Sequence, residues 1–122
     1  MGFQNHVKVL DIFKKTSIAV ACSRWEEPFG RTSLEASSRG CAVIISNRGG
    51  LPETITNGII VRNLNVKNIY EAIDRLITDK KKRINLQLLS IKNFYLTDNY
   101  ISNKIDAYRE KIFNSKLNFF YK

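Results

Sequence analysis

The sequence predicts an α/β fold, in which helices flank a sheet of parallel strands. Three apolar runs, at residues 18–22, 41–46 and 59–61, are typical of buried strands. Segments with turn residues and helical periodicity separate these runs, so strands and helices alternate. Because neighbouring parallel strands need a crossover between them, this alternation favours a parallel sheet covered by helices.

The first elements are a helix and a strand. Residues Met1–Phe3 look like the end of a strand, and Asn5 is a good N-cap for the helix that follows. His6 falls in the first turn of this helix, where we expect it to be exposed and without a partner nearby in the sequence. Residues Ser17–Ser23 then form a strand whose continuously apolar middle is typical of burial on both faces.

The middle of the chain continues the alternation. We predict a helix over residues 31–39, closed by Gly40 in the left-handed conformation that glycine favours after a helix. A fully apolar strand, Cys41–Ser46, follows it. The composition of Asn47–Pro52 predicts a turn, and Ile59–Val61 is a short strand.

Three periodic segments predict helices in the second half, the first of them capped by Asn65. Their apolar faces are Ile69, Ala72, Ile73, Leu76 and Ile77; then Ile84, Leu88, Ile91 and Tyr95; then Ile101, Ile105, Tyr108 and Ile112. We treat residues 1–122 as one partial domain, with an α/β core at 2–78 and C-terminal helices at 79–122.

Composition and charge limit the function classes. The chain has 43% hydrophobic and 25% charged residues, which is typical of a globular protein. No apolar run approaches the roughly 18 residues of a membrane helix, and the N-terminus has no signal-peptide pattern. We therefore expect a cytoplasmic protein, with peripheral contact at the inner face of the membrane as a further expectation.

The net charge of +9 is uneven. Residues 1–63 carry 8 basic and 5 acidic side chains, and residues 64–122 carry 12 and 6. A basic surface attracts polyanions. No aromatic side chains interleave with the densest cluster, Lys80–Arg83, so nucleic acid is not an expected partner.

The two cysteines do not predict a disulfide. Cys22 lies near the end of one strand and Cys41 at the start of the next. In parallel strands these positions are at opposite ends, roughly 15 Å apart, whereas a disulfide needs Cα atoms within about 7 Å. One histidine and two cysteines make no metal site by spacing, so no metal is expected.

The segment Trp25–Ala36 carries the chemistry. It joins a predicted strand to a helix, and ligands of open parallel sheets bind at the carboxyl ends of strands. The start of a helix suits a phosphate, because its first N–H groups have no partner. Carboxylates instead bind hydroxyls, and Glu27 and Glu35 flank this helix start. The combination predicts a sugar phosphate or a nucleotide sugar as ligand.

Residues Glu27–Glu35 read E-P-F-G-R-T-S-L-E, which resembles the E-x7-E signature of retaining glycosyltransferases of the GT-B fold, the large family-4 group. The resemblance continues through Gly40–Asn47 and Gly49–Glu53, and it extends from about Gly2 to about Ile77. It implies a Rossmann-like sheet, here as part of the C-terminal, donor-binding domain with a helical C-terminal tail.

The resemblance assigns roles to both carboxylates. The first glutamate of the motif reaches the donor sugar, so Glu27 is the candidate catalytic and sugar-binding residue, although nothing in the sequence makes it a nucleophile. Glu26 competes for this role because it lies one residue away, but the spacing to Glu35 and the family pattern both select Glu27. The second glutamate holds the ribose of the nucleotide, which implies that role for Glu35.

Backbone and hydroxyl groups complete the predicted donor site. Phe29, Gly30 and Arg31 would present N–H groups to the sugar and the diphosphate. Arg31 departs from the apolar residue that is usual in the family, and either contacts phosphate or is exposed. Thr32 is a better placed hydroxyl donor than Ser33. The pair Gly49-Gly50 is expected to shape a turn beside the ligand.

The resemblance implies a hexosyltransferase-like enzyme that takes a UDP- or GDP-sugar as substrate, with no cofactor, in lipopolysaccharide or surface polysaccharide synthesis. The acceptor domain and the basic pair that holds the diphosphate are not in this sequence, so we expect no transfer by this chain alone. The partners to be tested are that missing N-terminal domain, a homodimer and a membrane surface. The alternative is a non-catalytic basic α/β binding module.

Overall fold

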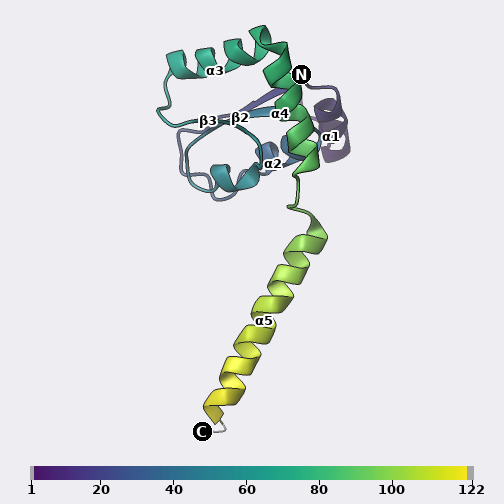
Figure 1. Ribbon diagram of the computed structural model, residues 1–122, viewed down its shortest axis with the longest axis vertical. Helices are drawn as coiled ribbons and strands as arrows, with labels where there is room; N and C mark the ends of the chain where they lie inside the picture. The colour runs from purple at the N-terminus through teal and green to yellow at the C-terminus, as the bar shows by residue number, and fades with distance from the viewer. Residues whose placement is uncertain (1, 121–122) are drawn as a thin grey trace.

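A three-stranded parallel sheet forms the centre of the computed structural model, which describes residues 2–120, with side chains described through residue 115 (Figure 1). The strands are β1 (Ile18–Ala21), β2 (Ala42–Ser46) and β3 (Gly58–Val61). They pair in the order β1-β2-β3, so β2 is central. In this register Val20, Ile44 and Ile59 lie side by side across the sheet. The α/β fold with a parallel sheet is confirmed.

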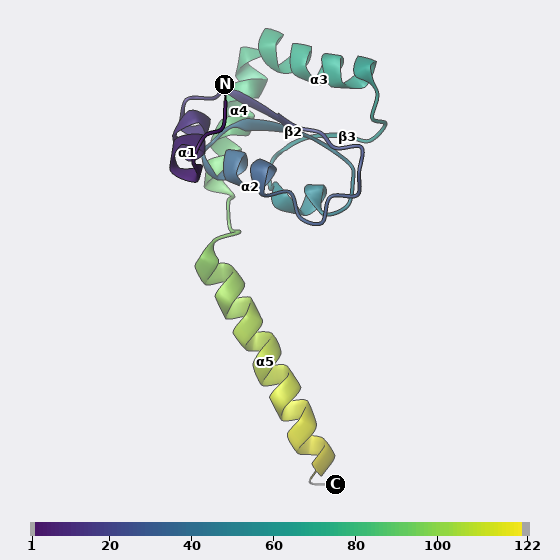
Figure 2. The same ribbon diagram turned by 180° about the vertical axis from the view of Figure 1, so that it is seen from behind.

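Helices cover both faces of this sheet, as the two opposite views show (Figures 1 and 2). The bounds are α1 (His6–Lys14), α2 (Arg31–Ser38), the 3-10 helix η1 (Leu51–Thr54), α3 (Val66–Thr78), α4 (Lys80–Lys92) and α5 (Asp98–Phe120). Helix α2 contacts α1, β1 and β2, while α3 and α4 contact each other and β2. The first five helical segments and the three strands therefore form one packed body.

Strand β2 divides the core into two layers. Val43 and Ile45 pack with Ala36 of α2, whereas Ala42 and Ile44 pack with Leu76 of α3. All of these side chains are buried. Successive side chains of a strand point to opposite faces, so a strand covered on both sides must be apolar at every position. The continuous apolar run therefore predicted β2 correctly.

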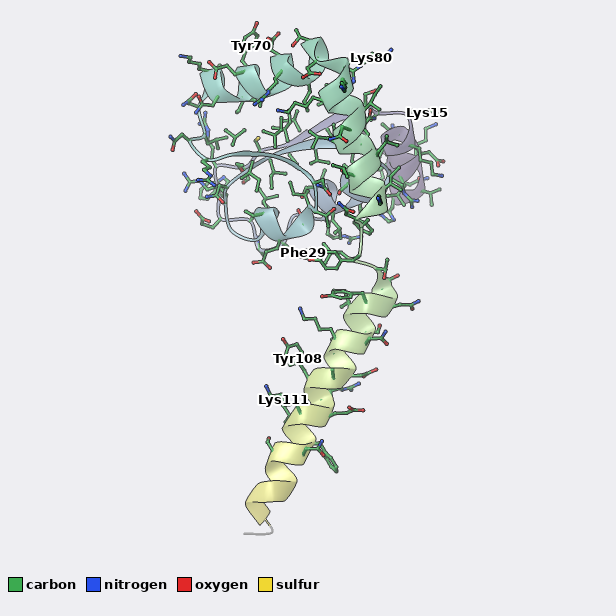
Figure 3. The ribbon with its side chains drawn as sticks, viewed as in Figure 1. Lys15, Phe29, Tyr70, Lys80, Tyr108 and Lys111 are labelled. Atoms are coloured by element: carbon green, nitrogen blue, oxygen red, sulfur yellow. The ribbon has the colours of Figure 1, made fainter. Side chains whose placement is uncertain are left out.

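Helix α5 extends away from the α/β body (Figures 1 and 2). Its predicted apolar face is exposed, with 56% of Ile112 and 57% of Tyr108 accessible to solvent. Figure 3 shows Tyr108 and Lys111 projecting from the helix, far from the sheet. Within residues 2–120, no helix is both long enough and apolar enough to cross a membrane.

Two predicted elements differ from the structure. Gly2 and Phe3 form no strand, and Phe3 is 96% exposed, because no described strand pairs with β1 on its outer edge. Met1 lies outside the described residues. The helix predicted to carry Tyr95 ends earlier, since α4 stops at Lys92. The N-cap of α3 is confirmed, because the side chain of Asn65 accepts a hydrogen bond from the N–H of Asn68.

Both cysteines are free thiols, as predicted from their positions. Burial raises the pKa of Cys41 from 9.0 to about 11, and it also raises the pKa of Cys22, which is only partly buried. A raised pKa lowers the fraction of reactive thiolate at any given pH. We expect iodoacetamide at pH 8 to label Cys22 first and Cys41 only after unfolding, as measured by mass spectrometry of digested protein. Equal labelling rates in the folded chain would contradict this burial.

Candidate functional site

The predicted motif forms the loop between β1 and α2, and a small cleft opens at its centre. This motif cleft has a volume of about 200 Å³ and lies at the carboxyl end of β1. Its lining residues are Ala21, Cys22, Ser23, Glu27, Gly30, Arg31, Thr32, Ser33 and Leu51. The structure thus brings Glu27, Gly30, Arg31 and Thr32 together at one place.

A second loop, residues 47–50, clamps the motif loop through Glu26. The Glu26 carboxylate accepts a hydrogen bond from the N–H of Gly49 and lies 3.2 Å from a guanidinium nitrogen of Arg48. The N–H of Gly50 donates to the carbonyl of Glu27 at 2.7 Å. Glu26 is therefore occupied in holding the two loops together.

The glycines of the second loop allow this close approach. Gly49 has a φ of +51°, and a Cβ at this position would lie 2.6 Å from the backbone nitrogen of Glu27. A Cβ on Gly50 would lie 2.6 Å from the carbonyl oxygen of Pro28. Both contacts are with backbone atoms, which cannot rotate away. The predicted structural role of Gly49-Gly50 is confirmed by this packing.

Helix α2 begins at the motif cleft without a side-chain cap. Gly30 is the N-cap residue, with a φ of +84°. The N–H groups of the first turn of a helix have no intrahelical acceptor, so those of Arg31, Thr32 and Ser33 are available to an anion in the cleft. The uncapped start of α2 and the side chain of Glu27 therefore line the same cleft.

The hydroxyls of this first turn differ in their freedom. Ser33 is buried, and its Oγ lies 2.6 Å from Oγ1 of Thr54 and 2.7 Å from the carbonyl oxygen of Gly30. These hydrogen bonds link α2 to η1 and engage the hydroxyl of Ser33 within the protein. Thr32 is exposed, and within the described residues its hydroxyl makes no hydrogen bond. Thr32 therefore remains able to bind a ligand.

Glu27 is the free carboxylate of the Glu26-Glu27 pair. It is partly buried at the wall of the motif cleft. Over residues 2–120, no described side chain or N–H group bonds to its carboxylate, in contrast to Glu26. An ionised carboxylate is an acceptor only, so Glu27 can receive hydroxyl hydrogens from a ligand in the cleft.

Glu35 lies one helical turn further along α2 and faces a different cleft. This α1–α2 cleft, of about 370 Å³, is lined by residues including His6, Leu10, Glu35, Arg39 and Asp98. Oε1 of Glu35 lies 3.0 Å from Nε2 of His6 and 3.4 Å from a guanidinium nitrogen of Arg31. Arg31 also lines the motif cleft, so the Arg31–Glu35 pair stands between the two clefts.

Phe29 is not directed into either of these clefts. It lines an apolar hollow of about 410 Å³ together with Leu34, Leu96 and Ile101. In Figure 3 its ring lies at the edge of the α/β body nearest to the start of α5. The side chain of Phe29 is thus separated from the residues of the motif cleft, although its backbone belongs to the same loop.

A larger cavity, of about 480 Å³, lies beside β3 and α3, where Arg62, Glu71 and Arg75 line it. None of the predicted site residues is there. We place the candidate site at the smaller motif cleft, because a free carboxylate, an uncapped helix start and a strand end meet only there among the described elements. Within residues 2–120, no three His, Cys, Asp or Glu side chains gather in a way that could hold a metal ion.

Sequence reasoning missed the contact between His6 and Glu35. The two residues are 29 positions apart, and no spacing rule connects them. His6 is exposed as predicted, but it does have a partner. The tie between Arg48 and Glu26 was missed for the same reason. Only the packing of α1 against α2, and of one loop on another, brings these side chains together.

Comparison with known proteins identifies the family. The family model for glycosyl transferases group 1 matches residues 1–87. Spore coat protein SA of Bacillus subtilis is 38% identical over 66% of this chain. An uncharacterized glycosyltransferase of Methanocaldococcus jannaschii is 30% identical over 89% of this chain. A GDP-mannose-dependent alpha-(1-6)-phosphatidylinositol monomannoside mannosyltransferase of Mycobacterium tuberculosis is 29% identical over 65% of it.

This chain spans only part of these relatives, namely 23% of the spore coat protein, 29% of the archaeal glycosyltransferase and 21% of the mannosyltransferase. The family match nevertheless covers the three strands, the motif loop, the whole motif cleft and the α1 and α2 walls of the α1–α2 cleft. The chain belongs to the glycosyl transferases group 1 family.

Proposed function

We propose that this chain is the donor-site portion of a retaining, family-4 glycosyltransferase that uses a nucleotide sugar. The observation that carries the proposal is the free carboxylate of Glu27 beside the uncapped start of α2. A carboxylate suits sugar hydroxyls and a helix start suits a diphosphate, so the two together match a nucleotide sugar. The E-x7-E spacing adds Glu35 as the ribose ligand, with Glu27 at the sugar.

The size of the clefts supports a ligand that extends over both of them. A site for a drug-sized ligand usually measures about 300–1,000 Å³, and the motif cleft is smaller than that. In this proposal the sugar and part of the diphosphate occupy the motif cleft, and the nucleoside occupies the α1–α2 cleft. Arg31 would contact the diphosphate between them, with backbone N–H groups at Phe29 and Gly30 and the hydroxyl of Thr32.

The acceptor site and the main cations for the diphosphate belong, in this proposal, to another domain. The 122-residue chain would therefore bind a donor without transferring its sugar. The name of the mycobacterial relative makes GDP-mannose one donor to test, alongside UDP-glucose and ADP-glucose. We propose a glycan or lipid acceptor in surface polysaccharide synthesis.

The proposal is tested by titrating these nucleotide sugars, and the matching nucleoside diphosphates, into the pure chain by calorimetry or NMR. We expect Glu27→Gln to weaken the binding of the nucleotide sugar by about tenfold. The affinity for the nucleoside diphosphate should not change, since in this proposal only the sugar contacts Glu27. Glu110→Gln, on exposed α5, is the matched control and is expected to change neither affinity.

Glu26→Gln separates the two neighbouring carboxylates. It weakens the contacts of Glu26 with Gly49 and Arg48, so we expect a lower melting temperature. For Glu27→Gln we expect no such change. Weak binding of every nucleotide, removed by salt and insensitive to Glu27, would instead favour the non-catalytic basic module. Sugar transfer by the pure chain would contradict the proposed need for a second domain.

A further inference from the structure

His6 and Glu35 come from two different helices and meet at the α1–α2 cleft. Their Nε2 and Oε1 atoms are 3.0 Å apart, and the Glu35 side chain is only 19% exposed. Helix α1 packs against α2, so the contact links two elements that are fixed relative to each other. This contact and its low exposure distinguish Glu35 from an ordinary glutamate on the surface of a helix.

The two carboxylate oxygens of Glu35 are used differently. Oε1 receives both described contacts, from Nε2 of His6 and from the guanidinium of Arg31. Over the part of the chain that the structure describes, Oε2 has no hydrogen-bond partner. Since each carboxylate oxygen can accept hydrogen bonds, one oxygen anchors the side chain and the other stays available.

His6 is better suited than Arg31 to fix the carboxylate. Arg31 is 75% exposed, against 57% for His6, lies on the same helix as Glu35 and makes a longer contact, 3.4 Å against 3.0 Å. Exposed pairs of this kind restrain little. The histidine side chain is shorter, and its backbone is held by Asn5, whose Oδ1 accepts from the N–H of Lys8 at 2.9 Å. His6 therefore presents its ring from a capped first helical turn.

The other charges at this cleft do not replace His6. Arg39 and Asp98 line the same cleft, but neither makes a described hydrogen bond to Glu35. An ionised carboxylate only accepts, so this contact is a hydrogen bond in the form of His6 that carries a hydrogen on Nε2.

The geometry points to His6 as a positioning residue for nucleotide binding. Its Nε2–H holds Oε1 of Glu35, so that Oε2 is presented to the ribose diol of a nucleotide in the α1–α2 cleft. This inference rests on the proposed donor site. It adds a residue from outside the E-x7-E segment and assigns it an action through Glu35 alone.

The experiment compares nucleotides with and without the ribose diol. UDP and GDP, and their 2′,3′-dideoxy counterparts, are titrated into the 122-residue chain and its variants by NMR. For whichever of UDP and GDP binds the chain, we expect His6→Ala to lower the affinity by about threefold to fivefold. The affinity for its dideoxy counterpart should not change. His6→Gln restores an N–H donor and should recover most of the affinity. Val7→Ala, exposed in the same turn, is the matched control.

A double-mutant cycle tests whether His6 acts through Glu35. The variant carrying both His6→Ala and Glu35→Gln should bind as weakly as Glu35→Gln alone. Additive losses, or equal losses for both kinds of nucleotide, would overturn the positioning role and indicate a merely structural contact. Wild-type affinity in His6→Ala would overturn this inference while leaving the proposed function intact. If the wild-type chain binds none of these nucleotides, the proposed function fails and this inference fails with it.

Discussion

Replacing Gly49 with alanine is expected to lower the melting temperature by at least about 10 °C and to remove nucleotide-sugar binding. The new Cβ would lie 2.6 Å from the backbone nitrogen of Glu27 and would also collide with the carbonyl of Glu27. The left-handed φ of +51° adds about 1–2 kcal/mol for a residue with a Cβ. Overpacking adds about 1–3 kcal/mol, and each 1 kcal/mol shifts the melting temperature of a small domain by about 4–8 °C.

The loss of binding has a specific cause, because the collision is with the backbone of the residue that faces the motif cleft. The second loop cannot stay against the motif loop, so Glu27 and the start of α2 move apart. Thermal unfolding followed by circular dichroism, and titration with the nucleotide sugar, measure the two effects. Gly2→Ala is the matched control, since a Cβ there meets nothing within 4 Å. Wild-type stability in Gly49→Ala would mean that the two loops do not meet as described.

The central strand was predictable because burial on both faces leaves a local mark in the sequence. The same burial predicted for β1 is wrong in part, because β1 lies at the edge of the sheet and Val20 is 45% exposed. A strand such as Ala42–Ser46 sends alternate side chains into two cores, so it shows an unbroken apolar run. Helix α2 was predictable in the same way, because Gly40, with a φ of +80°, closes it. Each of these signals lies within the element that it predicts.

Periodicity was a weaker guide in the C-terminal half. It identified the face of each helix that carries apolar residues, but it could not tell whether another element covers that face. Leu76 is fully buried, whereas Leu88 and Ile91 are 62% and 60% exposed and the predicted face of α5 is exposed throughout. The resemblance to the glycosyltransferase family also implies that Ile101–Ile112 and Phe119–Tyr121 contact the other domain, and the side chains of Phe119–Tyr121 lie outside the described residues.

In the candidate site too, local features were predictable from the sequence and tertiary contacts were not. The motif placed Glu27, Gly30, Arg31 and Thr32 at one strand end, and the structure brings them into one cleft. The motif spacing selected Glu27 over Glu26, but it could not show what Glu26 does instead, which is to bind Arg48 in a loop 22 residues further along the chain. Contacts of this kind follow from tertiary packing and have no local signature.

Ile44→Ala is expected to destabilise the chain by about 2–5 kcal/mol, the other large effect that we predict. Ile44 is fully buried on the central strand, between neighbours from β1 and β3, and packs in the core layer that includes Leu76. Truncation removes its apolar contacts and leaves a cavity that a sheet held on both sides cannot close. Urea unfolding monitored by circular dichroism measures the change.

Ile112→Ala is the matched control, because it removes the same atoms from a side chain that is 56% exposed on α5. In dilute solution we expect a change within about 0.5 kcal/mol. The comparison also tests the homodimer expected from the sequence. If a second copy of the chain covers α5, the loss of unfolding free energy caused by Ile112→Ala will rise with protein concentration. The loss caused by Ile44→Ala will not. A loss in dilute solution as large as that of Ile44→Ala would contradict the exposed α5 described here.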